Sequence, residues 1–349
     1  MSKVEFRTID GADDGMRLDR YLRNAFPQLT QGMIEKMCRK GELRLDKAKV
    51  KSNTRLSAGA ELRIPPVPTQ DSQSRPKPML KMPDADVRLI QSCVIYKDDD
   101  IIAINKPSGL ASQGGSKQAR HVDGMAQALM FGLDEKPRLV HRLDKDTSGV
   151  LLLARRRDVA AKLTAAFRAK TTRKTYWALV AGVPFPAHGT VRFGLVKAEG
   201  HGAGGEGEKM HCIHPRDVEK TEGAKSAITE YTLLVGLAKR VGWMALSPVT
   251  GRTHQLRAHM AELGHPIVGD GKYGGSSREN LGDGWGASLG EDVSRQLHLH
   301  ARSMAFNHPR TGKPIFIEAP LPEHMEQSWK EFGLNEYDPP KDPFAELGF

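Results

Sequence analysis

The sequence has few cysteines and no long apolar run, and both shortages narrow the class of protein. Three cysteines occur in 349 residues, at Cys38, Cys93 and Cys212, and three scattered thiols cannot form a disulfide framework. Apolar runs such as residues 150–154 are far shorter than the ~18 residues of a membrane span. The first residues lack the apolar stretch of a signal peptide. We therefore expect a protein of the reducing cytoplasm, without a membrane partner.

Acidic charge is also in short supply. The chain has 52 Lys+Arg against 42 Asp+Glu, a formal net charge of +10, and a pI near 9.4. Such an excess of cations favours a polyanionic partner. Hydrophobic residues make up 39% of the chain, so we expect a folded protein with a core, and the length allows one large domain or two ordinary ones.

Several signatures of catalysis are missing. No phosphate-binding G-x-x-x-x-G-K-[ST] loop and no dinucleotide-binding G-x-G-x-x-G occur, so no nucleotide cofactor is indicated. No Gly-x-Ser-x-Gly nucleophile turn is present. His211, Cys212 and His214 come nearest to a metal cluster, but no second cysteine pair accompanies them. The sequence therefore predicts neither a metal nor a cofactor.

Residues 1–66 are the first predicted domain, a small α/β module. Apolar residues at helical spacing predict a helix over 18–25, and a second helix begins after Thr30 and ends at Gly41. Residues 43–45 and 62–64 alternate as half-buried strands. Basic side chains lie off the apolar stripes and form either a polyanion-binding surface or a merely solvated one. They include Arg17, Arg20, Arg23, Lys36, Arg39 and Lys40.

The rest of the chain divides into a linker, a large domain and a tail. Six prolines among residues 65–83 predict an extended linker, which we place at 67–92. The large domain spans 93–330, and the acidic tail, 331–349, is expected to be loose. The large domain is predicted to be α+β, because its strands cluster without regular intervening helices. Strands are expected at 94–96, 101–104, 150–154, 176–181, within 228–247 and at 315–317, and helices at 122–129, 159–167 and 256–263. The glycine-rich or polar segments 200–225 and 276–294 are predicted to be surface loops.

Two dense polar clusters stand out in the large domain. Residues 141–149, His-Arg-Leu-Asp-Lys-Asp-Thr-Ser-Gly, precede the apolar strand at 150–154. Residues 250–257, Thr-Gly-Arg-Thr-His-Gln-Leu-Arg, open a helix, where arginines are unfavourable unless they face an anion. The simpler interpretation of the first cluster is a salt-bridged turn that caps a strand. Unpaired burial of so many charges would be costly, so both clusters need partners.

These two clusters resemble motifs of the RluA-type family of RNA pseudouridine synthases. Asn105-Lys106-Pro107-x-Gly109 is similar to the family's first motif, and Arg173-Lys174-x-Tyr176 to its tyrosine motif. Residues 265–270 match the third motif region, so four motifs occur in family order over about 94–320. The module at 17–66 resembles the S4-type RNA-binding domain. The resemblance implies a mainly antiparallel central sheet with a catalytic cleft, and cofactor-free isomerisation of uridine to pseudouridine in RNA.

The resemblance also implies roles for individual residues. Asp144 matches the essential aspartate, and a carboxylate nucleophile suits a reaction that breaks and remakes a glycosidic bond. The residues leave open whether it attacks the sugar or the uracil ring. We expect Arg257, or failing that Arg252, to be the cation beside Asp144, and Tyr176 to lie against the flipped uracil and help remove its ring proton. Arg142 would fill the space left by the base. Leu256, His141, Lys106 and Lys174 complete the predicted substrate site.

The substrate is harder to predict. Arg155, Arg156 and Arg157 begin a basic run that we expect to contact phosphates, although a solvated helix would look similar. Residues 39–42, 64–67 and 114–116 resemble the RluC-like subgroup, which modifies large-subunit ribosomal RNA. Transfer RNA remains an alternative target, and a non-catalytic RNA-binding factor or a metal-dependent RNA hydrolase is an alternative class. We expect a monomer.

Overall fold

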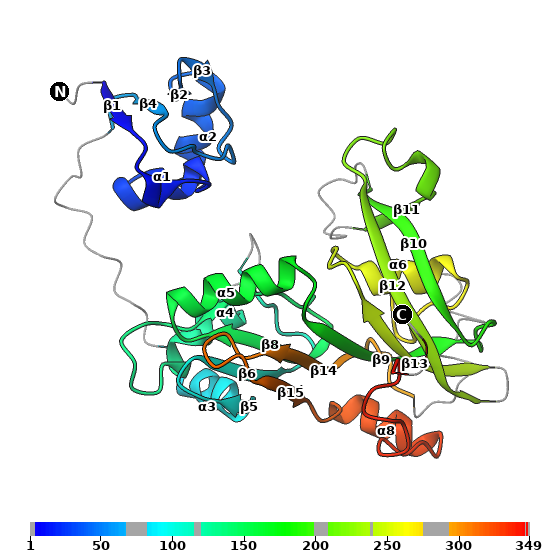
Figure 1. Cartoon of the computed structure of the whole chain (residues 1–349). Helices are drawn as coiled ribbons and strands as arrows, with labels where there is room; N and C mark the ends of the chain where they lie inside the picture. The colour runs from blue at the N-terminus through cyan, green and yellow to red at the C-terminus, as the bar shows by residue number, and fades with distance from the viewer. Residues whose placement is uncertain are drawn as a thin grey trace. The chain divides into compact units, whose positions relative to one another are not determined.

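The chain folds into two compact units, Met1–Lys81 and Met82–Phe349 (Figure 1). The computed structural model describes residues 4–67, 82–114, 120–198, 209–237, 240–274, 293–345 and 347. Among these residues, no helix is both long and apolar enough to cross a lipid bilayer.

The first unit joins two helices to a small sheet, as the sequence predicts. The elements are β1 (Glu5–Thr8), η1 (Gly11–Asp13), α1 (Leu18–Ala25), α2 (Gln31–Lys40), β2 (Arg44–Leu45), β3 (Ala48–Lys49) and β4 (Glu61–Ile64), and the sheet order is β1-β4-β2-β3. The Thr30 side chain accepts a hydrogen bond from the backbone N–H of Met33 and caps α2. Gly41, with φ of +71°, ends it. Apolar side chains from both helices and from β4 share one core.

The second unit is built on an 11-stranded sheet. Its strands are β5 (Val94–Lys97), β6 (Ile101–Lys106), β7 (Arg138–Leu139), β8 (Ser148–Ala154), β9 (Arg173–Ala181), β10 (His188–Lys197), β11 (Met210–Ile213), β12 (Lys225–Leu237), β13 (Val241–Pro248), β14 (Leu299–Asn307) and β15 (Pro314–Glu318). The main order is β11-β10-β12-β13-β9-β14-β8-β6-β5, with β15 beside β14 and β7 beside β8. Among the described strands only β14 and β8 pair in parallel. The α+β class and the mainly antiparallel sheet are therefore confirmed.

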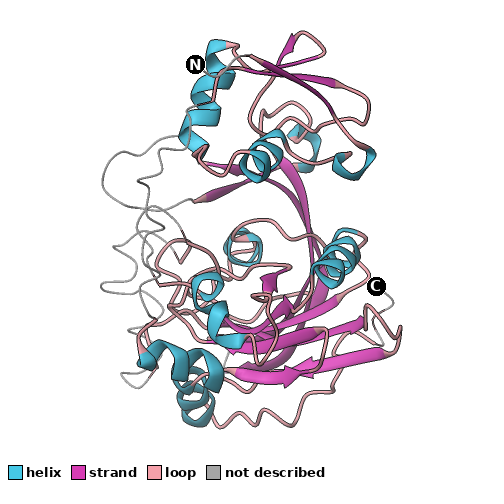
Figure 2. Ribbon diagram, turned by 90° about the vertical axis from the view of Figure 1, so that its left-hand side faces the viewer, coloured by secondary structure: helices cyan, strands magenta, loops and turns pink. Residues whose placement is uncertain are grey.

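Helices cover both faces of this sheet (Figure 2). They are α3 (Asp84–Ser92), α4 (Val122–Met125), η2 (Ala126–Leu129), α5 (Arg157–Arg168), η3 (Pro215–Asp217), α6 (Gln255–Glu262) and α8 (Glu323–Glu331). Alternate residues of β8 point to opposite faces, so Leu151 packs in the core beneath α3 and α4, whereas Leu152 packs beneath α5. Both faces of the central strands are therefore buried.

The predicted linker is too long at its C-terminal end. Residues 84–92, assigned to the linker, form helix α3, and Ile90 is completely buried in the main core. Leu89 packs against the same core. The proline-rich composition of residues 65–83 hid this helix, because its few apolar side chains follow directly on a segment whose sequence is typical of a linker. Most of the remaining linker, residues 68–81, lies outside the described residues.

The acidic tail is not loose, contrary to the prediction. Phe344 is 2% exposed and packs in a cluster with Trp177 and Trp243. Asp342 pairs with Arg173 at 2.9 Å. The tail's few aromatic and aliphatic residues bury enough surface to dock it, which net acidity alone does not reveal.

Four described strands of the second unit, β7, β10, β11 and β14, lie where the sequence indicated none. Strand β14 runs through the centre of the sheet, although it carries buried His300 and Arg302. Strand β11 occupies part of the segment 200–225 that was predicted to be a loop. Residues 200–208 of that segment, and 275–292 of the second predicted loop, lie outside the described residues.

Candidate active site

The loop that carries Asp144 lies between β7 and β8 and is held by hydrogen bonds to residues 105–112. The Ser112 hydroxyl donates to the carbonyl of Leu143 at 2.6 Å and accepts from its N–H at 3.0 Å. The backbone N–H of Gly109 donates to the carbonyl of Lys145 at 2.9 Å. Because these bonds hold the residues on both sides of Asp144, the backbone that carries its carboxylate is held in place by the fold.

Lys106 belongs to this fastening and does not line the cavity, so its predicted role in substrate binding is wrong. Its side chain is fully buried, and Nζ donates to the carbonyls of Pro107, Leu110 and Lys145 at 2.7 to 3.0 Å. Burial lowers the pKa of Lys106 to about 7, while Asp146 and Asp144 act in the opposite direction. Three carbonyl acceptors match the three N–H donors of the ammonium form, so Lys106 positions the loop that carries Asp144.

Gly149 sets the distance between the loop and the sheet. It pairs with Ala301 where β8 runs parallel to β14, and its φ is +108°. A Cβ atom here would collide with the carbonyl oxygen of Ala301. Only glycine allows this close approach, which brings the residues before β8 onto the middle of the sheet.

The opposite wall of the site is the segment 249–257, which leads from β13 into α6. Gln255 is 3% exposed and holds this segment to the sheet. Its amide nitrogen donates to the carbonyl of Ile228 at 2.8 Å, and its oxygen accepts from the Thr250 hydroxyl at 2.6 Å and from the N–H of Arg252 at 3.1 Å. The backbone of His254, the residue before Gln255, is in the left-handed region, with φ of +51°.

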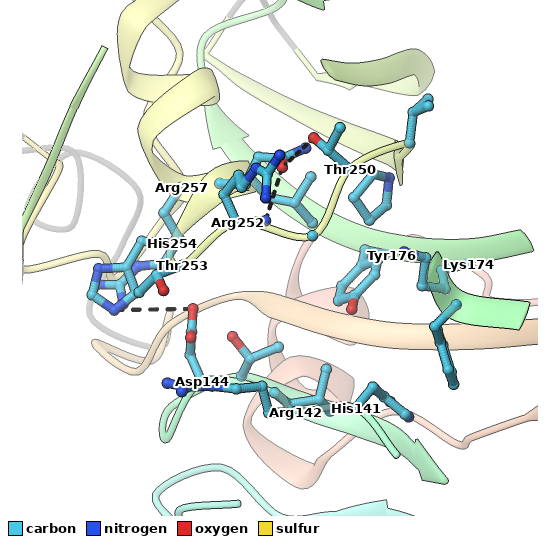
Figure 3. Close-up of a pocket in the computed structure, with 18 of the residues that line it drawn as sticks. His141, Arg142, Asp144, Lys174, Tyr176, Thr250, Arg252, Thr253, His254 and Arg257 are labelled. Atoms are coloured by element: carbon cyan, nitrogen blue, oxygen red, sulfur yellow. Dashed lines mark hydrogen bonds and ion pairs between the residues drawn. The ribbon is translucent and has the colours of Figure 1, made fainter. Parts of the chain in front are cut away.

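The two walls enclose a cavity of about 510 Å³ over β9 and β14 (Figure 3). The structure thus brings together eight of the nine predicted catalytic and substrate-binding residues. The predicted residues that line the cavity are His141, Arg142, Asp144, Lys174, Tyr176, Arg252, Leu256 and Arg257; Phe167, Arg168, Lys170, Thr253, His254 and Leu299 line it as well. The cavity is suitable for a nucleotide in RNA, because its lysine and arginine side chains can contact phosphates and its aromatic and aliphatic side chains can pack against a base.

The predicted ion pair between Asp144 and Arg257 is wrong. Arg257 instead makes a two-pronged ion pair with buried Asp270, with Nε to Oδ2 at 2.7 Å and Nη2 to Oδ1 at 2.6 Å. Arg252, the second choice, donates through Nε to the carbonyl of Ser226 at 3.1 Å. Among the described basic side chains, the one within ion-pair distance of the Asp144 carboxylate is His254, whose Nε2 is 4.0 Å from Oδ2 (Figure 3). Asp144 still raises the pKa of Arg257, so the two charges attract at longer range.

Burial sets the protonation of the other cavity residues. It raises the pKa of Tyr176, with a further contribution from the Asp144 charge, so the phenol stays protonated near neutral pH. Burial lowers the pKa of Lys174 and lowers that of His141 to about 3. His141 Nε2 accepts from the N–H of Leu152 at 2.9 Å, so this neutral imidazole supports β8.

The predicted RNA-contacting arginines fall into two groups. Arg155 is 5% exposed and donates to the carbonyls of Asp98, Met130 and Phe131, so its assignment to a surface is wrong. A run of charges in sequence does not show which member points inward. The others are exposed: Arg156, Arg157, and in the first unit Arg17, Arg20, Arg23, Lys36, Arg39 and Lys40. Arg17 pairs with Asp19 at 2.5 Å.

Of the residues that received no role from the sequence, two are joined beside Asp144: His254, which lines the cavity, and Tyr273, which contacts His254. His254 lies inside a quoted motif, and Tyr273 follows the third motif by three residues. The unusual left-handed backbone conformation of His254 at the start of α6 marks it as a candidate functional residue, and this conformation is visible only in the structure. Among the described residues, no group of three or more His, Cys, Asp or Glu side chains could hold a metal ion.

This fold and this site define an RNA pseudouridine synthase with an added RNA-binding domain, and comparisons with known proteins agree. Residues 100–262 match the family described as RNA pseudouridylate synthase, and residues 16–62 match the S4 domain. A human structure, RNA Pseudouridylate Synthase Domain Containing 4, is 28% identical and covers 72% of this chain and 97% of its own, with a TM-score of 0.57.

Similarity extends over nearly the whole chain in two bacterial relatives, both called ribosomal large subunit pseudouridine synthase C. The protein of Vibrio cholerae serotype O1 is 36% identical over 338 residues, which cover 94% of this chain and 96% of the relative. That of Rickettsia felis is 37% identical over 323 residues, which cover 90% and 96%. The chain belongs to the RluA-type family of RNA pseudouridine synthases and carries an N-terminal S4 domain.

Proposed function

We propose that this enzyme isomerises uridine to pseudouridine in large-subunit ribosomal RNA, with Asp144 as the nucleophile and without a cofactor. The observation that carries the proposal is the placement of Asp144: its carboxylate faces a cationic cavity from a loop that is fastened on both sides. The names of the two bacterial relatives favour ribosomal RNA over transfer RNA.

The proposed reaction requires no group other than the side chains of this cavity. Uridine and pseudouridine are isomers, so the bond from N1 to the sugar is exchanged for one from a ring carbon, that carbon loses a proton, and N1 gains one. Nothing is oxidised or reduced. The Asp144 carboxylate attacks the bound nucleoside and is released when the new bond closes.

The other cavity residues bind and orient the nucleotide. A base must leave its stack to enter the cavity, and exposed Arg142 fills the space that it vacates. Tyr176 and Leu256 pack against the flipped uracil. Because the pKa of Tyr176 is raised, its hydroxyl stays protonated, and we assign it a packing role rather than that of a phenolate base. Lys174 and Arg252 contact the neighbouring phosphates.

The test is pseudouridine mapping in ribosomal RNA from cells that lack this protein. We expect specific pseudouridines to be missing from the large-subunit RNA and to return when the wild-type gene is restored, but not with Asp144→Asn. Purified protein should also modify that RNA in the presence of EDTA. Missing pseudouridines in transfer RNA alone would contradict the proposed substrate, and a full set restored by Asp144→Asn would contradict the nucleophile.

A further inference from the structure

We propose that His254 is a positioning residue that presents an Nε2–H to the Asp144 carboxylate, and that Tyr273 and strand β11 select this tautomer. The inference rests on the proposed role of Asp144. Among the described basic side chains, His254 is the one within ion-pair distance of that carboxylate, with Nε2 4.0 Å from Oδ2. Hydrogen bonds in unliganded catalytic sites are often long and tighten when substrate binds.

The tautomer follows from the bonds on the other side of the ring. Nδ1 of His254 lies 3.0 Å from the hydroxyl of Tyr273. That hydroxyl accepts a hydrogen bond from the backbone N–H of Met210 at 2.7 Å. Burial raises the pKa of Tyr273 to about 12, so the hydroxyl keeps its proton and donates it to Nδ1. An imidazole that accepts at Nδ1 carries its proton on Nε2, which faces Asp144.

The electrostatic surroundings favour a neutral ring. Burial lowers the pKa of His254, and Arg257 and Lys272 add to that effect, whereas Asp144 and Asp270 oppose it. A neutral N–H donor orients the carboxylate and stabilises its charge without forming a full ion pair, which would make the nucleophile less reactive. The arrangement also assigns a role to part of the segment 200–225, because Met210 begins β11 at the edge of the sheet and supplies the N–H that orients Tyr273.

Removing one hydroxyl tests this chain of contacts. Tyr273→Phe keeps the ring that packs against the Arg257 guanidinium, 5.2 Å from its centroid, and deletes only the bonds to His254 and Met210. We expect kcat to fall roughly 10- to 100-fold, as for a small displacement of a reacting group, with little change in KM. In ¹⁵N NMR spectra of the labelled full chain, the His254 ring should lose its pure Nε2–H signature. Tyr231→Phe is the matched control, because its buried hydroxyl donates to the carbonyl of Pro186, away from the cavity.

His254→Gln provides a second variant, because its amide can place an N–H close to the position of Nε2. It should retain more activity than His254→Ala. Wild-type kcat in Tyr273→Phe, or an unchanged Nε2–H signature, would overturn the inference. If Asp144→Asn is inactive at the same time, only the role of His254 fails and the proposed function stands.

A separate observation in the first unit leads to a second proposal. We infer that the open face of its small sheet binds an unpaired stretch of RNA, with a base stacked on Phe6. The strand register places four side chains in one row across the sheet: Phe6 opposite Arg63, Arg63 opposite Arg44, and Arg44 opposite Lys49. Opposed residues in antiparallel strands point to the same face.

This face is the side of the sheet away from the core. The neighbours of Arg63 on β4, Leu62 and Ile64, are completely buried beneath the helices, whereas Phe6 is 58% exposed. Phe6 lines a hollow of about 620 Å³ together with three cations, Arg44, Lys47 and Arg63, and two acids, Glu42 and Glu61.

The row across the sheet carries three cations and no acid. The Arg44 guanidinium donates to the carbonyls of Gly41 and Lys47, and that of Arg63 to the carbonyl of Glu42, so both are held in place by neutral groups. An aromatic ring beside such cations is the combination that binds single-stranded nucleic acids. Phe6 and Arg63 lie outside residues 16–62, so the S4 match includes only Arg44 and Lys49 of this row.

Affinity of the full chain for single-stranded oligouridylate and for an RNA duplex of the same length tests the surface. Phe6→Leu keeps an apolar side chain but removes the ring, and should weaken single-strand binding on the order of 10-fold while leaving duplex binding unchanged. Phe6→Tyr should bind like the wild type. Arg44→Gln should reduce the salt dependence of single-strand binding. Equal binding by Phe6→Leu and the wild type, or an equal loss in Phe6→Leu and Phe6→Tyr, would overturn the proposal.

Discussion

Some charged side chains of the second unit are buried and satisfied by partners inside the fold, and others are exposed beside the cavity. Arg257 and Asp270 are 4% and 3% exposed and satisfy each other, and Arg155 is satisfied by backbone carbonyls. Arg142 is exposed at the edge of the cavity. The sequence could predict which residues gather around Asp144, but not which acid would pair with Arg257, because two acids in different motifs compete for one guanidinium and only the fold decides between them.

The buried ion pair has a measurable consequence. Asp270→Asn leaves the Arg257 charge buried without a carboxylate, so we expect the free energy of unfolding to fall by about 3 kcal/mol. Arg138→Gln is the control, since its pair with Glu135 at 3.4 Å is partly exposed and should contribute less than about 0.5 kcal/mol. Urea titration of both variants measures the difference. Equal stability of Asp270→Asn and the wild type would show that Arg257 has another partner.

At the scale of elements, regular patterns were predictable and exceptions were not. The hairpin of β5 and β6, the helices α1, α2, α5 and α6, and strands β8, β9 and β13 lie where apolar spacing places them. β14 has no such pattern, because it carries His300 and Arg302 into the core. His300 Nδ1 lies 2.8 Å from the Ser148 hydroxyl, and Arg302 donates to the carbonyl of Ala319 at 2.7 Å. Polar side chains that find partners only in the folded sheet give no signal in the sequence.

The parallel contact of β8 with β14 allows a direct test of how the site is held. Gly149→Ala adds a Cβ against the Ala301 backbone and requires a residue other than glycine at φ of +108°. We expect a loss of about 3 kcal/mol in unfolding free energy and a loss of activity, because the loop before β8 must move. Gly271→Ala is the control, since a Cβ there meets nothing within 4 Å. Thermal unfolding and pseudouridine yield should separate the two variants. Similar values for both would contradict the conclusion that the contact between Gly149 and Ala301 holds the site.

For the whole molecule, buried histidines predict a sensitivity to mild acid. Burial lowers the pKa of His141 and His300 to about 3, and that of His259 and His298 to about 4. In the unfolded chain, histidine has a pKa near ~6.5. Between these values the unfolded chain binds protons that the folded chain does not, so the free energy of unfolding decreases as the pH falls below about 6.5.

Each of the four groups contributes up to about 1.4 kcal/mol per pH unit in this window. Carboxylates with a lowered pKa act at a lower pH: Asp100, whose pKa is lowered by Arg310, loses its contribution only below its ordinary value of 3.8. Urea unfolding at pH values of about 7.5, 6.5 and 5.5, chosen to span the histidine window, should give a clearly smaller unfolding free energy at the lowest pH. A flat profile would mean that the imidazoles gain protons without disturbing the core.

The domain plan was predictable from composition only in outline. The change from a basic module to a proline-rich segment marks the first boundary, and the structure divides the chain at Lys81 and Met82. Helix α3 and the C-terminal residues are docked by a few buried apolar side chains, such as Ile90 and Phe344. The average composition of a segment does not reveal such single residues.

The central claim is that the carboxylate of Asp144 is the nucleophile, and its most direct test compares two neighbouring aspartates. Asp144→Asn keeps the size of the side chain but removes the nucleophilic charge, whereas Asp146 is an exposed aspartate two residues away that does not line the cavity. The measurement is the yield of pseudouridine in large-subunit ribosomal RNA treated with each purified variant, with thermal unfolding of each protein recorded in parallel. We expect no pseudouridine from Asp144→Asn, near wild-type yield from Asp146→Asn, and both proteins folded. Activity in Asp144→Asn, or its loss in Asp146→Asn alone, would contradict the claim.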